Sequence, residues 1–226
     1  MNSTLNYIGI KPGIGNAISF GWDQMKKNFL TFFLVVFVLM VADMPIQLLE
    51  YDWNDGWKHD IPIALMFVLF LYRILLVPVI EYGADLLILQ GVRGEKVEVK
   101  DIFIGFKDYL NIILVNILMF GLIGISFFLF IIPGIIVSVR LAFVSYLVMD
   151  EKMNPIEAVE TSWKITKGHG WKIFGLAILS IFIAILGLLF LIVGIIPAII
   201  WIKSSFAALY LSITGKEEES IPEENS

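Results

Sequence analysis

Long apolar runs are the feature that most constrains how this chain can fold. They lie between polar breaks at roughly 29–49, 61–90, 110–132, 135–149, 172–193 and 195–214. A bilayer has a hydrocarbon core about 30 Å thick, which takes about 20 apolar residues of helix. Of the 226 residues, 58% are hydrophobic and 16% are charged, whereas soluble domains hold about 45–50% apolar and about 25% charged residues. We therefore predict an all-α integral membrane protein with six transmembrane helices.

Three breaks define how these runs connect. Only Pro133-Gly134 separates the third run from the fourth, and only GIIP at 194–197 separates the fifth from the sixth. Because two joined runs exceed the length that one spanning helix needs, each pair is predicted to be a hairpin. Pro133-Gly134 would form one outer tip, since Pro interrupts a helix and Gly permits a sharp reversal. The second run is longer than a bilayer requires, and Pro78 is expected to kink it.

The distribution of Lys and Arg predicts the orientation. One side of the membrane would carry twelve of these residues, whereas the other has Lys58 alone, in the acidic loop EYDWNDGWKHD with Trp53 and Trp57. Cytoplasmic loops are enriched in Lys and Arg, so both termini are predicted to be cytoplasmic. The twelve are Lys11, Lys26, Lys27, Arg93, Lys96, Lys100, Lys107, Lys152, Lys164, Lys167, Lys172 and Lys216.

A short amphipathic segment precedes each pair of runs, and we predict a cytoplasmic interfacial helix for each. In the third, Asn154 is placed as an N-cap, Pro155 as the first helical residue and Gly168 as a stop. This recurring order of one amphipathic segment and two apolar runs indicates a single domain over 1–216 with three repeats, near 14–91, 99–149 and 154–214. An acidic disordered tail is predicted at 217–226. Alternatively, membrane hairpins commonly begin with interfacial helices without being repeats. The apolar faces would be Ile14, Ile18, Trp22 and Met25; Ile102, Phe106, Tyr109 and Leu110; and Ile156, Val159 and Trp163.

Charges inside the apolar runs are the candidate functional residues, because a charge in the bilayer is costly. With a rise of about 1.5 Å per residue, Asp43, Arg140 and Lys203 fall in one layer about 8–10 Å below the outer boundary. Arg73 would lie about 18 Å from the outer end of its helix. This ligand or ion-pair layer has a formal surplus of positive charge, which suits a phosphate or carboxylate headgroup.

Structural roles for the same charges stay open. Arg140 and Lys203 are shallow enough to extend to the outer headgroups, and an Asp43–Arg140 pair could join two helices. Glu81 and Asp85 are predicted to lie at a solvated helix end near the cytoplasmic interface. The segment TKGHGWK (166–172) is basic and rich in Gly but lacks the spacing of a phosphate-binding loop, so a helix stop with contacts to anionic lipid is expected.

The residues that common enzyme chemistries need are missing. Cysteine is absent, which excludes disulfides and thiolate nucleophiles, and the two histidines, His59 and His169, fall in different loops. No nucleophile motif, metal-ligand spacing or nucleotide fingerprint occurs. We therefore predict no enzyme activity, no cofactor and no metal. Basic residues follow membrane topology rather than a soluble patch, so the expected partners are membrane lipids, anionic phospholipid included, and not nucleic acid.

The stretch FIIPGIIVSVRLAFVSYLVMDEKMNPIEAVETSWKITKGHGWKIFGLAIL (130–179) resembles a known family. The family comprises the membrane domains of some glycerophosphoryl diester phosphodiesterases and related stand-alone prokaryotic membrane proteins. The shared features are the Pro-Gly pair, an Arg six residues after that Gly, the NPIEAVETSW segment and TKG before the fifth run. The likeness is clearest over 100–214, and the phosphodiesterase domain has no counterpart in this chain. It implies a six-helix fold in a prokaryotic plasma membrane, close to phospholipid chemistry.

Two functions fit these observations. The chain would bind or transport an anionic amphiphile or lipid headgroup in an outward-facing basic layer. Alternatively, it would be a non-catalytic scaffold, partner or immunity-type subunit whose buried charges only hold helices together. A cavity lined by Arg140 and Lys203 would favour the first function, and a fully paired Asp43–Arg140 contact the second.

Overall fold

The computed structural model describes residues 11–50, 62–189 and 191–219, and every regular element within them is a helix. Five helices are long and apolar enough to cross a membrane, or six if the bent pair Ile14–Lys27 and Phe29–Pro45 counts as one. The chain is thus an all-helical, multi-pass membrane protein, as predicted. The five are Ile63–Arg93, Val99–Leu129, Ile131–Met149, Gly170–Leu189 and Gly194–Gly215.

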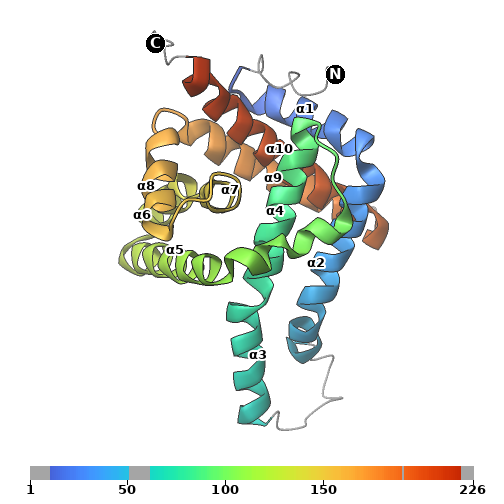
Figure 1. Cartoon of the computed structure of the whole chain (residues 1–226), viewed down its shortest axis with the longest axis vertical. Coiled ribbons are helices and arrows are strands. Elements are labelled where there is room, and N and C mark those ends of the chain that lie inside the picture. The colour runs from blue at the N-terminus through green and yellow to red at the C-terminus, as the bar shows by residue number, and fades with distance from the viewer. Residues whose placement is uncertain (1–10, 51–61, 190, 220–226) are drawn as a thin grey trace.

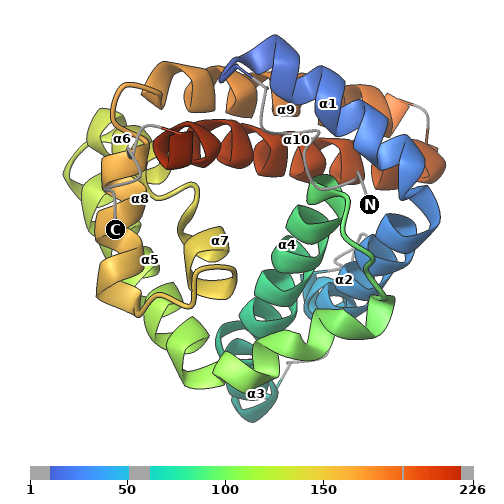
Figure 2. The same ribbon diagram turned by 45° about the horizontal axis from the view of Figure 1, so that its top comes forward.

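The first helix packs along the last. Helix α1 (Ile14–Lys27) meets α2 (Phe29–Glu50) at a bend of 96° and lies beside α10 (Leu191–Glu219) (Figure 2). At Gly21 the two backbones are so close that a Cβ would lie 2.7 Å from the Ser205 backbone nitrogen. The Trp201 indole N–H also donates to the carbonyl of Ile18 at 2.9 Å. The buried residues of α1 are Ala17, Gly21, Gln24 and Met25, so of the predicted face Ile14, Ile18, Trp22 and Met25 only the last is fully buried.

The second apolar run is broken where Pro78 predicts. Helix α3 (Ile63–Leu75) ends before Leu76, and α4 (Val77–Arg93) has Pro78 in its first turn, where no N–H is needed. Helix α3 projects from one end of the molecule and buries none of its residues, whereas α4 is buried over most of its length (Figure 1). The apolar side chains of α3 are therefore left for the membrane to cover.

The segment after α4 is a 3-10 helix rather than the expected α-helix. It is η1 (Val99–Asp108), which continues into α5 (Tyr109–Leu129). Its buried residues, Ile102 and Gly105, are three positions apart, as the 3-10 repeat requires. Two glycines bring η1 against α4: a Cβ at Gly83 would lie 1.8 Å from the Ile102 carbonyl oxygen, and one at Gly105 2.3 Å from that of Val79.

The reversal between α5 and α6 (Ile131–Arg140) lies at Phe130, whose backbone is extended. The predicted tip at Pro133-Gly134 is therefore wrong. Pro133 lies in the first turn of α6, where a missing N–H does not interrupt the helix. Gly134 instead allows α6 to pack closely against α5, because a Cβ there would lie 2.4 Å from the Phe127 ring.

Two short helices follow α6 and lead to the fifth run. They are α7 (Val144–Met149) and α8 (Pro155–Ile165). The predicted start of α8 is confirmed, since the Asn154 side chain accepts from the Glu157 N–H at 3.0 Å and Pro155 is the first helical residue. Gly168 has a left-handed backbone with φ 85° in the turn before α9 (Gly170–Leu189).

The sequence GIIP does not separate the last two helices, because α10 begins at Leu191 and contains Pro197. The backbones of α9 and α10 are close at Gly187, where a Cβ would lie 2.7 Å from the Ala198 Cβ. Part of the predicted tail, 217–219, belongs to α10. The loop that contains Trp53, Trp57 and Lys58, predicted to be on the outer side, and the tail residues 220–226 lie outside the described residues. The three repeats stay a prediction.

Candidate functional site

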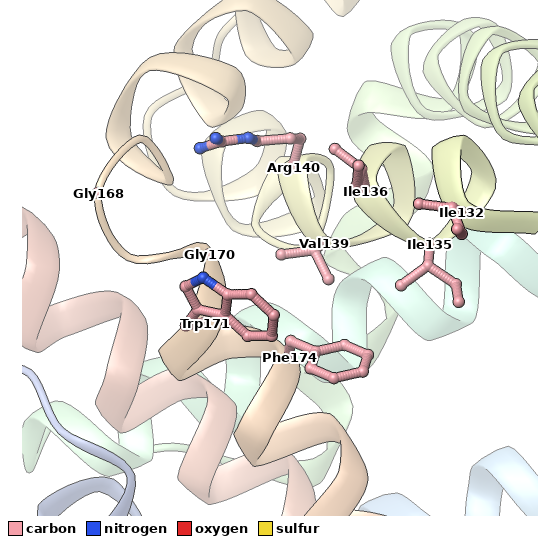
Figure 3. A pocket seen from close by; sticks show the side chains of 9 residues that line it. All are labelled: Ile132, Ile135, Ile136, Val139, Arg140, Gly168, Gly170, Trp171 and Phe174. Atoms are coloured by element: carbon pink, nitrogen blue, oxygen red, sulfur yellow. The ribbon is translucent and has the colours of Figure 1, made fainter.

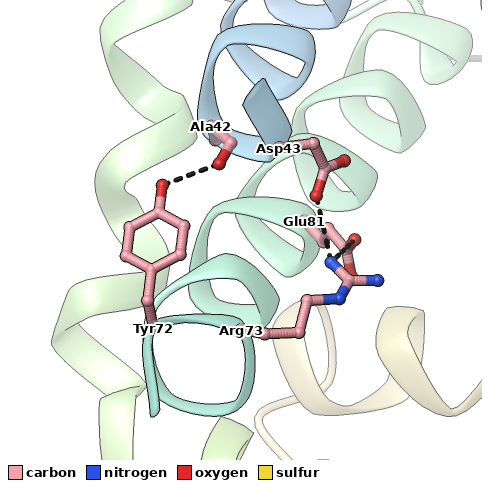
Figure 4. A network of polar contacts seen from close by, with 5 residues as sticks. All are labelled: Ala42, Asp43, Tyr72, Arg73 and Glu81. Atoms are coloured by element: carbon pink, nitrogen blue, oxygen red, sulfur yellow. Dashed lines mark hydrogen bonds and ion pairs between the residues drawn. The ribbon is translucent and has the colours of Figure 1, made fainter. Parts of the chain in front are cut away.

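Three of the four predicted site residues lie in a cluster of ion pairs from α2, α3, α4 and α10. The Arg73 Nη1 atom lies 3.1 Å from the Asp43 Oδ1 atom and 3.4 Å from the Glu81 Oε1 atom (Figure 4). The Lys203 Nζ atom lies 2.5 Å from the Asp85 Oδ1 atom. A hydrogen bond of 2.7 Å from the Tyr72 hydroxyl to the Ala42 carbonyl also joins α2 to α3. The cluster thus ties four helices together.

The predicted surplus of positive charge is absent here. A cavity of about 720 Å³ is lined by Asp43, Glu81, Asp85 and Lys203. With Arg73, the cluster holds three carboxylates and two cations, so its formal charge is negative by one. The prediction failed because α4 continues to Arg93, which places Glu81 and Asp85 within the spanning helix rather than at a solvated end.

Arg140 belongs to a different part of the molecule, at the last residue of α6. Its carbonyl accepts a hydrogen bond of 2.7 Å from the Ser162 hydroxyl of α8, and its guanidinium carbon lies 5.9 Å from the centre of the Trp163 ring. The expected Asp43–Arg140 pair is absent, since the ion-pair partner of Asp43 is Arg73. Because α6 begins at Ile131, Arg140 lies about 14 Å along it and reaches α8 instead of an outer layer.

The Arg140 guanidinium has a nitrogen without an acceptor. Its Nη1 atom is buried and has no hydrogen-bond partner within the described part of the chain. Contact with the Trp163 ring is a cation–π interaction, worth about 0.5–2 kcal/mol, and it leaves the N–H groups unsatisfied. A buried donor without an acceptor is costly, and more so when it is charged. The Arg140 guanidinium therefore has hydrogen-bonding capacity that the described residues do not use.

An apolar groove of about 570 Å³ extends from this guanidinium. Its walls are α6, the turn between α8 and α9, and the first turns of α9. Figure 3 shows Arg140 at one end, with the side chains of α6 facing Trp171 and Phe174 of α9. The groove therefore offers a charge at one end and apolar surface along the rest. Its lining is Ile132, Ile135, Ile136, Val139, Arg140, Gly168, Gly170, Trp171 and Phe174.

Sequence reasoning found the charged end of this groove and missed its walls. Gly168, Gly170 and Trp171 belong to the segment expected to contact anionic lipid, but no groove was predicted there. The sequence pattern that could have predicted this wall of the groove is the pair Trp171 and Phe174. They are three residues apart and therefore lie on one face of α9. Among the described residues, no group of three or more His, Cys, Asp or Glu side chains is placed to hold a metal ion.

Comparison of the chain with family models, curated proteins and solved structures gave no match. The resemblance of residues 130–179 to the phosphodiesterase-associated membrane domains therefore stays a prediction.

Proposed function

We propose that this protein binds an anionic amphiphile within the membrane, with the headgroup at Arg140 and the apolar part along α6 and α9. The observation that carries the proposal is Arg140 at the end of an apolar groove, with a guanidinium nitrogen that has no acceptor among the described residues. An anionic headgroup would satisfy this donor with a charge-assisted hydrogen bond. The isoleucines of α6 and the rings of α9 would cover an acyl chain.

The site differs in position from the basic layer that the sequence predicts. Arg140 contacts α8, and α8 with the following turn and α9 carries Lys164, Lys167 and Lys172. We propose that this basic side is cytoplasmic, with both termini, because it holds the excess of Lys and Arg. The groove would then open to the cytoplasmic leaflet rather than outward. Anionic phospholipids of that leaflet are attracted to basic segments, so they are the proposed partners.

The scaffold function has its own support in the ion-pair cluster. Arg73 and Lys203 each have a carboxylate partner, and the pairs cross between helices. Charges that satisfy one another in this way serve packing, so we assign Asp43, Arg73 and Lys203 a structural role. Arg140 alone of the four carries the binding proposal.

A binding experiment with matched charge variants tests the proposed function. The purified protein in a non-ionic detergent is titrated with laurate and, separately, with a neutral twelve-carbon alcohol. We expect Arg140→Gln to weaken laurate binding by about tenfold or more, since a hydrogen bond to a charged group is worth about 1.5–3 kcal/mol. Binding of the alcohol should change little.

Lys164→Gln is the control, because it removes one positive charge close to Trp163. The Lys164 side chain is 75% exposed, and its amine lies 3.9 Å from Glu160. This variant should bind laurate like the wild type. Equal laurate affinities for wild type and Arg140→Gln, or no preference for the anion over the alcohol, would overturn the proposal.

A further inference from the structure

The start of α9, which lines the same groove, carries a second set of hydrogen-bond donors. The His169 carbonyl accepts from the N–H groups of Lys172 and Ile173 at 2.9 and 3.1 Å, so the helix begins directly after His169. The N–H groups of Gly170 and Trp171 come before this first bond. Neither has a backbone acceptor among the described residues. Such amides and the aligned peptide dipoles make the first turn of a helix electropositive.

These amides lie in the same groove as the unsatisfied guanidinium. Gly170 and Trp171 line it together with Arg140 (Figure 3). The backbone here is open to close approach: a Cβ at Gly168 would meet no atom within 4 Å, and one at Gly170 only Val139, at 3.9 Å. Arg140 lines the same space and has a guanidinium nitrogen without an acceptor among the described residues, which is an observation independent of the helix start.

We propose that the headgroup held here is a phosphate, bound between the Arg140 guanidinium and the Gly170 and Trp171 amides. The inference rests on the proposed function and narrows its ligand to a phosphate-bearing lipid. A phosphate monoester has three terminal oxygens, so it can accept from the guanidinium fork and from both amides together. A carboxylate has two oxygens and would leave part of this donor set unused. The apolar groove then selects a lipid phosphate over free inorganic phosphate.

Two ligands with the same chain length test the headgroup. Dodecyl phosphate and laurate both carry twelve carbons, and the wild-type protein is titrated with each in the same detergent. We expect dodecyl phosphate to bind about tenfold tighter or more, because it engages donors that laurate cannot reach at once. Inorganic phosphate at the concentration of dodecyl phosphate should not displace it.

Gly170 offers a variant pair that isolates one amide. Gly170→Pro removes the N–H at the first helical position, where Pro is well tolerated. Gly170→Ala keeps the N–H and adds a methyl group at ordinary contact distance from Val139. Dodecyl phosphate binding should fall by about tenfold in the Pro variant and by clearly less in the Ala variant, because only Pro removes the N–H. Laurate binding should fall less than dodecyl phosphate binding in the Pro variant.

The outcomes separate the two proposals. Equal affinities for the two ligands, both reduced by Arg140→Gln, would overturn the phosphate inference and leave the anionic groove in place. If Arg140→Gln changed the affinity for neither ligand, both the phosphate inference and the proposed function would be overturned. Displacement by inorganic phosphate would show a free-phosphate site and refute the lipid source. Should Gly170→Pro fail to fold, as judged by circular dichroism, the wild-type preference between dodecyl phosphate and laurate still decides the inference.

Discussion

At the scale of single residues, Lys203 has a carboxylate partner in Asp85, whereas a guanidinium nitrogen of Arg140 has no acceptor among the described residues. Counting along a helix gives the height of a residue, and it says nothing about which neighbour the residue faces. The sequence predicts Lys203 about 8–10 Å below the outer boundary, whereas α10 begins at Leu191 and places it about 18 Å along the helix. At that height it meets Asp85 of α4. The sequence also marks Arg140 as a charge in an apolar run, but not that its Nη1 atom has no acceptor among the described residues.

The Lys203–Asp85 pair predicts a specific pattern of stability. Lys203→Met leaves Asp85 without its cation inside a spanning helix, so we expect the free energy of unfolding to fall by about 3 kcal/mol. The Lys203 and Asp85 side chains are 28% and 19% exposed, so the expected loss of unfolding free energy is at the low end of the range for breaking a buried ion pair. Combining Lys203→Met with Asp85→Leu should restore most of the loss, because both charges are then removed. Unfolding in detergent, followed by circular dichroism, measures both variants.

Lys100→Met provides the comparison for an exposed pair. The Lys100 amine lies 2.6 Å from Glu98, but the two side chains are 74% and 68% exposed, so the melting temperature should not change measurably. If Lys203→Met cost no more than Lys100→Met, the structural role of the ion-pair cluster would be wrong.

At the scale of helices, apolar runs predicted the elements well, and the connections less well. Pro78 and Pro133 each lie in the first turn of a helix, a few residues after a break, whereas Pro197 lies inside α10. A Pro in the first turn does not interrupt its helix, so the break comes before the Pro rather than at it. Gly134 and Gly187 allow close contact between helices rather than turns. Sequence alone does not distinguish these uses, because the contacts involve residues of another helix.

The contact between α4 and η1 gives a prediction at this scale. In Gly83→Ala, the new Cβ would lie 1.8 Å from the Ile102 carbonyl oxygen, a backbone atom that cannot rotate away. We expect α4 and η1 to separate and the unfolding free energy to drop by about 1–3 kcal/mol or more. The same detergent unfolding measurement applies.

Gly121→Ala is the matched control, since a Cβ there meets no atom within 4 Å and Gly121 lies inside α5. It should be neutral or stabilising by up to about 1 kcal/mol, because Ala loses less backbone entropy in a helix. A Gly83→Ala variant as stable as Gly121→Ala would contradict the close approach of α4 and η1.

At the scale of the whole molecule, composition was enough to predict an all-helical membrane protein, because so much apolar surface has no other solvent. The basic residues further predict the orientation. The sequence could not predict which other helix the end of each helix contacts. The end of α6 lies against α8, and this contact moves Arg140 from the predicted outer layer to the side of Lys164 and Lys167.

The proposed orientation predicts a labelling pattern in cells. The chain has no cysteine, so Asp55→Cys and Glu98→Cys each introduce a single thiol. An impermeant thiol reagent should label position 55 in intact cells and position 98 only after permeabilisation, since Glu98 lies in a segment that carries Lys96 and Lys100. Labelling of position 98 but not 55 in intact cells would reverse the orientation and place the groove in the outer leaflet.

The central claim is that Arg140 binds the anionic headgroup of an amphiphile, and a crystal structure grown from a lipid phase with dodecyl phosphate tests it most directly. We predict density for a phosphate with an oxygen about 2.7–2.9 Å from a nitrogen of the Arg140 guanidinium, and with the alkyl chain between α6 and α9. A groove that is empty or filled only by alkyl chains, with the headgroup bound elsewhere, would contradict the account.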